Sequence, residues 1–113
     1  MKKKTVIKVK PLSVNVCYRG RRYKAKDYTS YETEVIYSLP KMKVPDGNLK
    51  LSLDFGVSNR NSDIDNFIKP FIDILQTKYG FNDNRIYALN VKKELVKKKD
   101  EFIGFYLEEL CTE

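Results

Sequence analysis

The alternation of apolar and polar residues predicts secondary structure most clearly in the middle of the chain. Residues 49–57 alternate leucine, phenylalanine and valine with polar residues or glycine, which is the pattern of a strand with one buried face. From Ile64 to Tyr79, apolar residues recur at three- and four-residue steps, which predicts an amphipathic helix capped by Gly80. Pro70 is compatible with this helix if it lies in the first turn or if the helix kinks there.

The N-terminal third of the chain has weaker patterns. Residues 5–10 alternate apolar side chains with lysine and predict a short strand, and residues 12–26 predict a basic loop. A helix should follow from Asp27 or Thr29 and end before the next proline. Thr29 and Glu32 have the spacing of a capping box.

The C-terminal third predicts two strands, at residues 86–96 and 102–107, joined as a hairpin by a turn at 97–100. We expect four apolar residues of the first strand to share one face: Tyr87, Leu89, Val91 and Leu95. The predicted order of elements is β-α-β-α-β-β. This order indicates a single α+β domain over residues 1–113, with helices packed on a mixed sheet.

The charge of the chain is concentrated at its beginning. The whole chain has 22 basic and 15 acidic residues, a formal charge of +7. Residues 1–28 hold ten basic residues and one acidic residue, so the remainder is slightly acidic. An excess of this kind favours an anionic partner such as nucleic acid. The residues that we expect to contact phosphates are Arg19, Arg21, Arg22, Lys24 and Lys26. The alternative is a solvated basic loop without a partner.

The chain contains no histidine, and this excludes several kinds of chemistry. A Ser-His-Asp triad, a Cys-His pair and a histidine general base are all impossible. The two cysteines, Cys17 and Cys111, lie far apart, so we expect neither a disulfide nor a zinc site. Any catalysis must use carboxylates, lysine, tyrosine or a metal held by oxygen ligands.

The location of the protein is expected to be cytoplasmic, without a membrane span. The longest apolar runs are only a few residues. Met1 to Lys4 have the charge of a signal-peptide start, but residues 5–10 alternate with lysine and lack an apolar core.

The segment around residue 65 has the residue types that bind a hard metal ion. Asp63 and Asp65 lie two residues apart at the predicted junction of strand and helix, and Lys69 follows one turn later. Asp83 lies in the loop after the helix. Three carboxylates without histidine or cysteine suit Mg²⁺ or Mn²⁺. On a basic protein, such an ion indicates hydrolysis of phosphodiester bonds.

Each of these residues also has an ordinary structural interpretation. Acidic residues at helix starts commonly cap the helix, which applies to Asp63 and Asp65. Lys69 and Asp73 have the spacing of a surface ion pair on one helix. Asp83 lies between two asparagines and is compatible with simple turn formation.

The sequence resembles the RusA family of Holliday junction resolvases. The resemblance rests on Asp63-x-Asp65-Asn66-x-x-Lys69-x-x-x-Asp73-x-Leu75, then Gly80-Phe81 and Asp83 ahead of Ile86. A weaker match is the segment Ser13-Val14-Asn15-Val16-Cys17-Tyr18-Arg19. The match extends from about residue 11 to 107. Members of this family are small homodimeric endodeoxyribonucleases, common in phages and prophages, that cut four-way DNA junctions.

The resemblance implies a role for each matching residue. Asp63, Asp65 and Asp83 would be the catalytic aspartates that bind Mg²⁺, with Mn²⁺ as an alternative, and Lys69 would be the essential lysine. Asn66 and Asp73 would support the site or the fold. The chain departs from the family at Asn82, where members often have the first of two adjacent aspartates.

Together these observations predict a Mg²⁺-dependent endonuclease for branched DNA that acts as a homodimer in a bacterial host cell. One alternative is a nucleic-acid-binding module without catalytic activity, which would be indifferent to Mg²⁺ and to the acidic residues. Another is a structural protein whose acidic cluster pairs with its own basic loop, which would have no salt-sensitive affinity for DNA.

Overall fold

Strand β2 (Leu49–Val57) forms the centre of the sheet, as its alternating sequence predicts. Its leucines and Phe55 point to one face and are almost completely buried. Hydrogen-bonded strands lie on both sides of β2. The residues that alternate with its apolar residues are also partly or fully buried. The buried central strand therefore provides the platform on which the other elements are placed.

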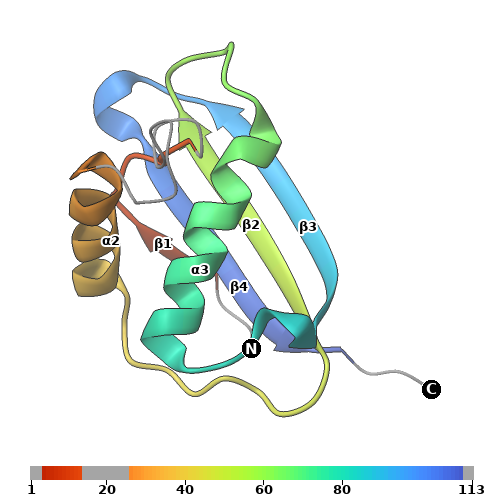
Figure 1. Cartoon of the computed structure of the whole chain (residues 1–113). Helices are drawn as coiled ribbons and strands as arrows, with labels where there is room; N and C mark the ends of the chain where they lie inside the picture. The colour runs from red at the N-terminus through yellow and green to blue at the C-terminus, as the bar shows by residue number, and fades with distance from the viewer. Residues whose placement is uncertain (1–3, 14–25, 111–113) are drawn as a thin grey trace.

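The computed structural model describes residues 4–13 and 26–110, in which two α-helices cover one face of a four-stranded sheet (Figure 1). This confirms the α+β class, the mixed sheet and the predicted element order. The elements are β1 (Thr5–Ile7), α2 (Lys26–Ser38), β2 (Leu49–Val57), η1 (Ile64–Phe67), α3 (Ile68–Tyr79), η2 (Asp83–Arg85), β3 (Ile86–Leu95), η3 (Lys98–Asp100) and β4 (Phe102–Glu109).

The predicted hairpin of the last two strands is wrong. The strand order is β1-β4-β2-β3, so β2 lies between β3 and β4. Strand β3 is parallel to β2, whereas β4 is antiparallel to both β2 and β1. The reason lies in the connection: Val96 donates a backbone hydrogen bond to Val57 O (2.8 Å), and Glu101 binds Ser58. The segment between them therefore crosses the end of β2, and β4 pairs on its far side.

Helix α3 packs its apolar face on the middle of the sheet. The Phe71 ring is fully buried between Phe55 and Phe105, with ring centroids 6.3 and 5.7 Å away. Pro70 lies in the first turn of the helix, where a missing N–H costs nothing. Gly80 ends the helix at φ 70°, the left-handed conformation that the sequence predicts for it.

Helix α2 covers the sheet beside α3 and starts earlier than the capping-box spacing suggests. It begins at Lys26, which puts Thr29 inside the helix, where its carbonyl accepts a hydrogen bond from the Thr33 side chain. The capping box at Thr29 is therefore wrong, whereas the predicted start at Asp27 is right to within one residue and the end of the helix before Pro40 is confirmed. Within the described residues, no helix has the length and apolar character needed to cross a membrane.

Strand β3 forms one edge of the sheet. Leu89, Val91 and Leu95 share one face of the strand, as predicted, and pair with β2 residues that face the helices. Tyr87 does not belong to this series, because a register irregularity after Ile86 leaves it without a paired residue on β2. The helices do not reach this edge, so Tyr87, Leu89 and Leu95 are 67%, 46% and 60% exposed. An edge strand with exposed apolar side chains is available for pairing with another chain.

Candidate functional site

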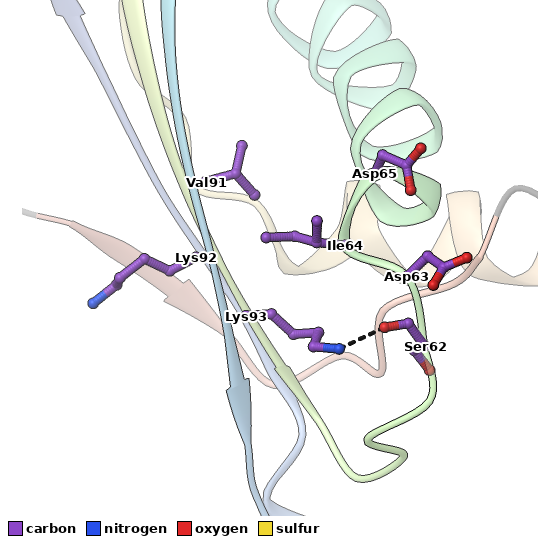
Figure 2. Close-up of a pocket in the computed structure, with 7 residues that line it drawn as sticks. All are labelled: Ser62, Asp63, Ile64, Asp65, Val91, Lys92 and Lys93. Atoms are coloured by element: carbon purple, nitrogen blue, oxygen red, sulfur yellow. Dashed lines mark hydrogen bonds between the residues drawn. The ribbon is translucent and has the colours of Figure 1, made fainter.

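Asp63 and Asp65 flank the first residue of the helical turn that leads into α3. Asp63 is extended, with φ −81° and ψ 132°, and its carbonyl accepts a hydrogen bond from the backbone N–H of Asn66 (3.1 Å). Ile64 points toward Val91 of β3, whereas both carboxylates project away from that strand (Figure 2). The local backbone thus turns the i, i+2 spacing into two exposed carboxylates on one side of the turn.

A shallow pocket of about 570 Å³ lies between this turn and β3. It is lined by Ser62, Asp63, Ile64, Asp65, Val91, Lys92 and Lys93. Lys93 donates hydrogen bonds to the carbonyls of Ser62 (2.5 Å) and Arg60 (3.3 Å), which fixes the loop ahead of Asp63 (Figure 2). Lys93 thus lies at the wall of the pocket, whereas the two carboxylates project to the outer side of the turn.

Helix capping does not account for the two acidic residues. Asp63 occupies the N-cap position of η1, but its side chain makes no capping hydrogen bond. Within the described residues, neither Asp63 nor Asp65 accepts a side-chain hydrogen bond or forms an ion pair. The two carboxylates are exposed on the same side of one turn, where they are available to ligate a hard cation.

Lys69 is directed along the helix. Its Nζ atom lies 3.0 Å from Asp73 Oδ1, which is the i, i+4 ion pair that the ordinary interpretation of its spacing predicts. Asp73 also accepts a hydrogen bond from Gln76 Nε2 (3.4 Å). The Lys69 side chain is 66% exposed, so this ion pair contributes little to stability. Asp73 supports the helix surface and holds Lys69.

Asp83 lies at the other end of α3 from Asp63 and Asp65. The 12 residues of this helix span about 18 Å at the usual rise of roughly 1.5 Å per residue. The Asp83 carboxylate is exposed in a separate pocket of about 250 Å³, with Ile72, Tyr87 and Leu89 among its neighbours. The turn is stabilised by the Asn82 side chain, which accepts a hydrogen bond from Asn84 N (2.9 Å), and by the Asp83 backbone N–H, which donates to Gln76 Oε1 (2.8 Å).

The expected set of three carboxylates is thus not assembled within one chain. In the described part of the protein, no three acidic or cysteine side chains gather closely enough to hold a metal ion. The structure brings Asp63 and Asp65 together and places Asp83 elsewhere. Lys26 begins α2, and the four remaining basic residues expected to contact DNA lie outside the described residues.

Lys93 is a residue of this pocket that the sequence analysis missed. It lies on β3, 28 residues from Asp65 along the chain, and no local pattern distinguishes it from its neighbour Lys92. Alternation along the strand separates the two: Figure 2 shows Lys93 at the pocket loop and Lys92 pointing away from it. Only the parallel pairing of β3 with β2 places Lys93 beside the acidic turn.

A second charged cluster lies on the face of the sheet away from the helices. Asp54 is 2% exposed, and its Oδ2 atom lies 2.9 Å from Lys4 Nζ and 3.8 Å from Lys92 Nζ. Burial raises the pKa of Asp54, but Glu94 and the two lysines outweigh burial and leave this pKa below its ordinary value. The neighbouring Asp54 raises the pKa of Glu94 in turn. This cluster joins β1 to β2 and β3.

Comparison of the chain with protein-family models and with curated proteins finds no match.

Proposed function

We propose that this protein is a divalent-metal-dependent endodeoxyribonuclease for branched DNA, in line with its resemblance to the RusA resolvases. The observation that carries the proposal is the pair Asp63 and Asp65, whose carboxylates are exposed on the same side of the turn that leads into α3. The net charge of +7 favours a polyanionic substrate. A phage or prophage origin and a cytoplasmic location belong to the same proposal, through the resemblance.

The donor set of this pocket fits Mg²⁺, with Mn²⁺ as an alternative. Mg²⁺ in proteins is typically held by one or two carboxylates together with water and substrate phosphate oxygens. Asp63 and Asp65 supply two carboxylates that are exposed to solvent, so a phosphate group can reach them. When bound, the ion would neutralise charge on the scissile phosphate and make a bound water more acidic.

The residues of the chain itself position the substrate around these carboxylates. Lys93 holds the loop ahead of Asp63 and adds positive charge to the pocket wall. Lys69 follows in the first turn of α3, where its ion pair with Asp73 is exposed. In the proposal it moves toward the phosphate and stabilises the negative charge that develops there. The basic residues between Arg19 and Lys26 bind the DNA backbone.

Asp83 is proposed to act in a homodimer. It lies near the start of β3, whereas the pocket of Asp63 and Asp65 lies beside the end of β3. Within one chain, Asp83 and this pocket are therefore separated by the length of α3. Antiparallel pairing of β3 with β3 of a second copy would bring the start of one strand beside the end of the other. Asp83 of the partner subunit would then approach Asp63 and Asp65. The exposed apolar side chains of β3 support pairing at this edge.

Cleavage of a synthetic four-way junction tests the proposed function. Labelled junction and linear duplex are incubated with the protein in Mg²⁺ or in EDTA, and the products are separated on denaturing gels. We expect cleavage of the junction in Mg²⁺ only. Asp65→Asn should abolish cleavage and leave junction binding intact, because it removes a charge that repels DNA. Asp46→Asn is the matched control, since Asp46 is exposed in a turn and lines none of the described pockets.

The same experiment separates the alternatives. A nucleic-acid-binding module without activity would bind the junction in a salt-dependent way in both Mg²⁺ and EDTA and cut neither substrate. Wild-type cleavage by Asp65→Asn would refute the assignment of the site.

A further inference from the structure

A basic turn of three consecutive lysines, Lys97, Lys98 and Lys99, lies between β3 and β4. All three residues are exposed, and within the described part of the chain none of them forms an ion pair or a side-chain hydrogen bond. Residues 29–113 hold twelve basic and fourteen acidic residues, so this part of the chain is slightly acidic. The basic turn is therefore a local concentration of positive charge that no neighbouring carboxylate neutralises.

The basic turn is fixed to the end of β2 on both of its sides. Before the turn, Val96 donates a backbone hydrogen bond to Val57 O (2.8 Å). After the turn, the buried Glu101 carboxylate accepts hydrogen bonds from Ser58 N (3.1 Å) and Ser58 Oγ (2.7 Å). The lysines therefore extend from a fixed position, and a ligand does not have to order the backbone that carries them.

The same hydrogen bonds place the basic turn near the two aspartates of the candidate site. Ser58, which binds Glu101, begins the segment that leads to Asp63, and Ser62 at its end accepts a hydrogen bond from Lys93 (2.5 Å). Figure 1 shows this segment and η3 at the same end of the sheet. Five residues span at most about 18 Å. A DNA duplex with a phosphate at Asp63 therefore has further phosphates near the basic turn within about five base pairs.

The arrangement of the lysines favours a polyanion over a single small anion. Asp100 N donates to Lys97 O (2.8 Å), and residues 98–100 form a 3₁₀ helix. Successive side chains of such a helix point about 120° apart, so the lysines cannot all converge on one phosphate. Double-stranded DNA carries one negative charge for each ~1.7 Å of its length. Its backbone therefore offers a separate phosphate to each lysine.

We propose that Lys97, Lys98 and Lys99 bind the phosphate backbone of a duplex arm beside the phosphodiester bond that is cut. The inference rests on the proposed function, because Asp63 and Asp65 define where that bond lies. It adds a second contact with DNA to the one expected of the basic residues between Arg19 and Lys26. Contacts with phosphates carry no sequence information, so the basic turn orients the arm and raises the affinity for all sequences alike.

Binding of a labelled four-way junction in EDTA tests this contact without any need for cleavage. The dissociation constant is measured by fluorescence anisotropy over a range of KCl concentrations, for the wild-type chain and for Lys98→Gln/Lys99→Gln. The slope of log K against log [KCl] should become shallower by about 0.9 for each phosphate contact that is lost, and so by up to about 1.8 in this variant. The affinity should fall for junctions of any sequence.

The control variant is Lys41→Gln/Lys43→Gln. It removes the same charge from two exposed positions between α2 and β2, at the opposite end of the sheet (Figure 1). Its salt dependence should remain that of the wild type if the contact is local to the basic turn. The comparison therefore separates a contact at the basic turn from an effect of net charge alone.

Neutral phosphates locate the contact on the DNA. Single methylphosphonates are placed in turn at successive positions of one arm of the junction. Those within about five base pairs of the cut phosphate should weaken binding by the wild-type chain and have less effect on Lys98→Gln/Lys99→Gln, which has already lost the contact. The control variant should respond to each position as the wild type does.

The outcomes separate this inference from the proposed function. Equal salt slopes in the two double variants would overturn the inference, and so would methylphosphonates whose effect is the same at every position. Either result leaves Mg²⁺-dependent cleavage of junctions standing if Asp65→Asn abolishes it. A shallower slope and a localised methylphosphonate effect in a protein that cuts no junction would support the duplex contact and remove the proposed nuclease activity.

Discussion

Two variants that are each inactive should regain activity when they are mixed. Asp65→Asn and Asp83→Asn should each abolish cleavage, because each removes one carboxylate from both sites of the proposed dimer. In a mixed dimer, one site combines both defects. The other site combines intact Asp63 and Asp65 from one subunit with intact Asp83 of the partner subunit. One of its two sites is therefore complete.

The expected recovery follows from the geometry and from the statistics of exchange. The length of α3, about 18 Å, separates Asp83 from Asp65 within one chain and prevents a shared ion there. With equal amounts and free exchange of subunits, about half of the dimers are mixed, so about a quarter of all sites are intact. Because a mixed dimer has one working site, it should nick the junction rather than cut two strands symmetrically.

The assay is cleavage of a labelled four-way junction after the two variants have been unfolded and refolded together, with mixed dimers identified by a tag on one variant. A mixture of Asp63→Asn with Asp65→Asn is the control and must stay inactive, because both changes affect the same half of the site. Mixed dimers of Asp65→Asn and Asp83→Asn that cut nothing would refute the sharing of the site. Full activity of Asp83→Asn alone would remove Asp83 from the metal site.

Three further predictions concern stability and the role of the lysine. Gly56→Ala should destabilise the fold by about 1–3 kcal/mol in urea unfolding, because its Cβ atom would lie 2.2 Å from the Phe102 ring. Adding Phe102→Leu to this variant should recover part of the lost stability. A Gly56→Ala variant with the stability of the wild type would contradict the contact. Because the neighbouring Asp54 raises the pKa of Glu94 above its ordinary 4.5, the folded protein holds this proton more tightly than the unfolded chain. The resulting contribution to the stability of the fold is complete below the ordinary pKa and is lost as the pH rises through the raised pKa. Glu94→Gln should therefore flatten the pH dependence of the urea midpoint between these two pKa values. A variant with the same pH profile as the wild type would contradict the raised pKa. Lys69→Met should lower the cleavage rate roughly tenfold or more at nearly unchanged stability, whereas cleavage at the wild-type rate would limit Lys69 to its ion pair with Asp73.

Elements with strong local patterns could be predicted from the sequence with good accuracy. The strand at 49–57 and the helix that ends at Gly80 are both confirmed, including the tolerated position of Pro70. The start of α2 was predicted less well, because Thr29 and Glu32 match a capping box by spacing alone. Local sequence determines whether a turn of helix is favourable, but the packing of the helix on the sheet determines which residue begins it.

The pairing of strands and the composition of the candidate site depend on contacts that no local pattern contains. Residues 86–96 and 102–107 each have the pattern of a strand, but the crossing of the chain over the end of β2 separates them. The same arrangement places Lys93 beside the acidic turn and Glu101 beside Ser58 at the end of β2. Neither residue is marked by its neighbours in the sequence.

The sequence by itself determined the helix of residues 68–79, the position of Asp63 and Asp65 at its start, and a chemistry without histidine. These properties depend on residue type and on periodicity over a few residues. The tertiary structure alone decided that Asp83 lies at the opposite end of that helix, and that Lys93 lies beside the turn of the two aspartates. The physical reason is that a helix is rigid, so a residue just before it and a residue just after it stay apart by the length of the helix. Strands that are distant in the sequence, in contrast, come together by pairing in the sheet.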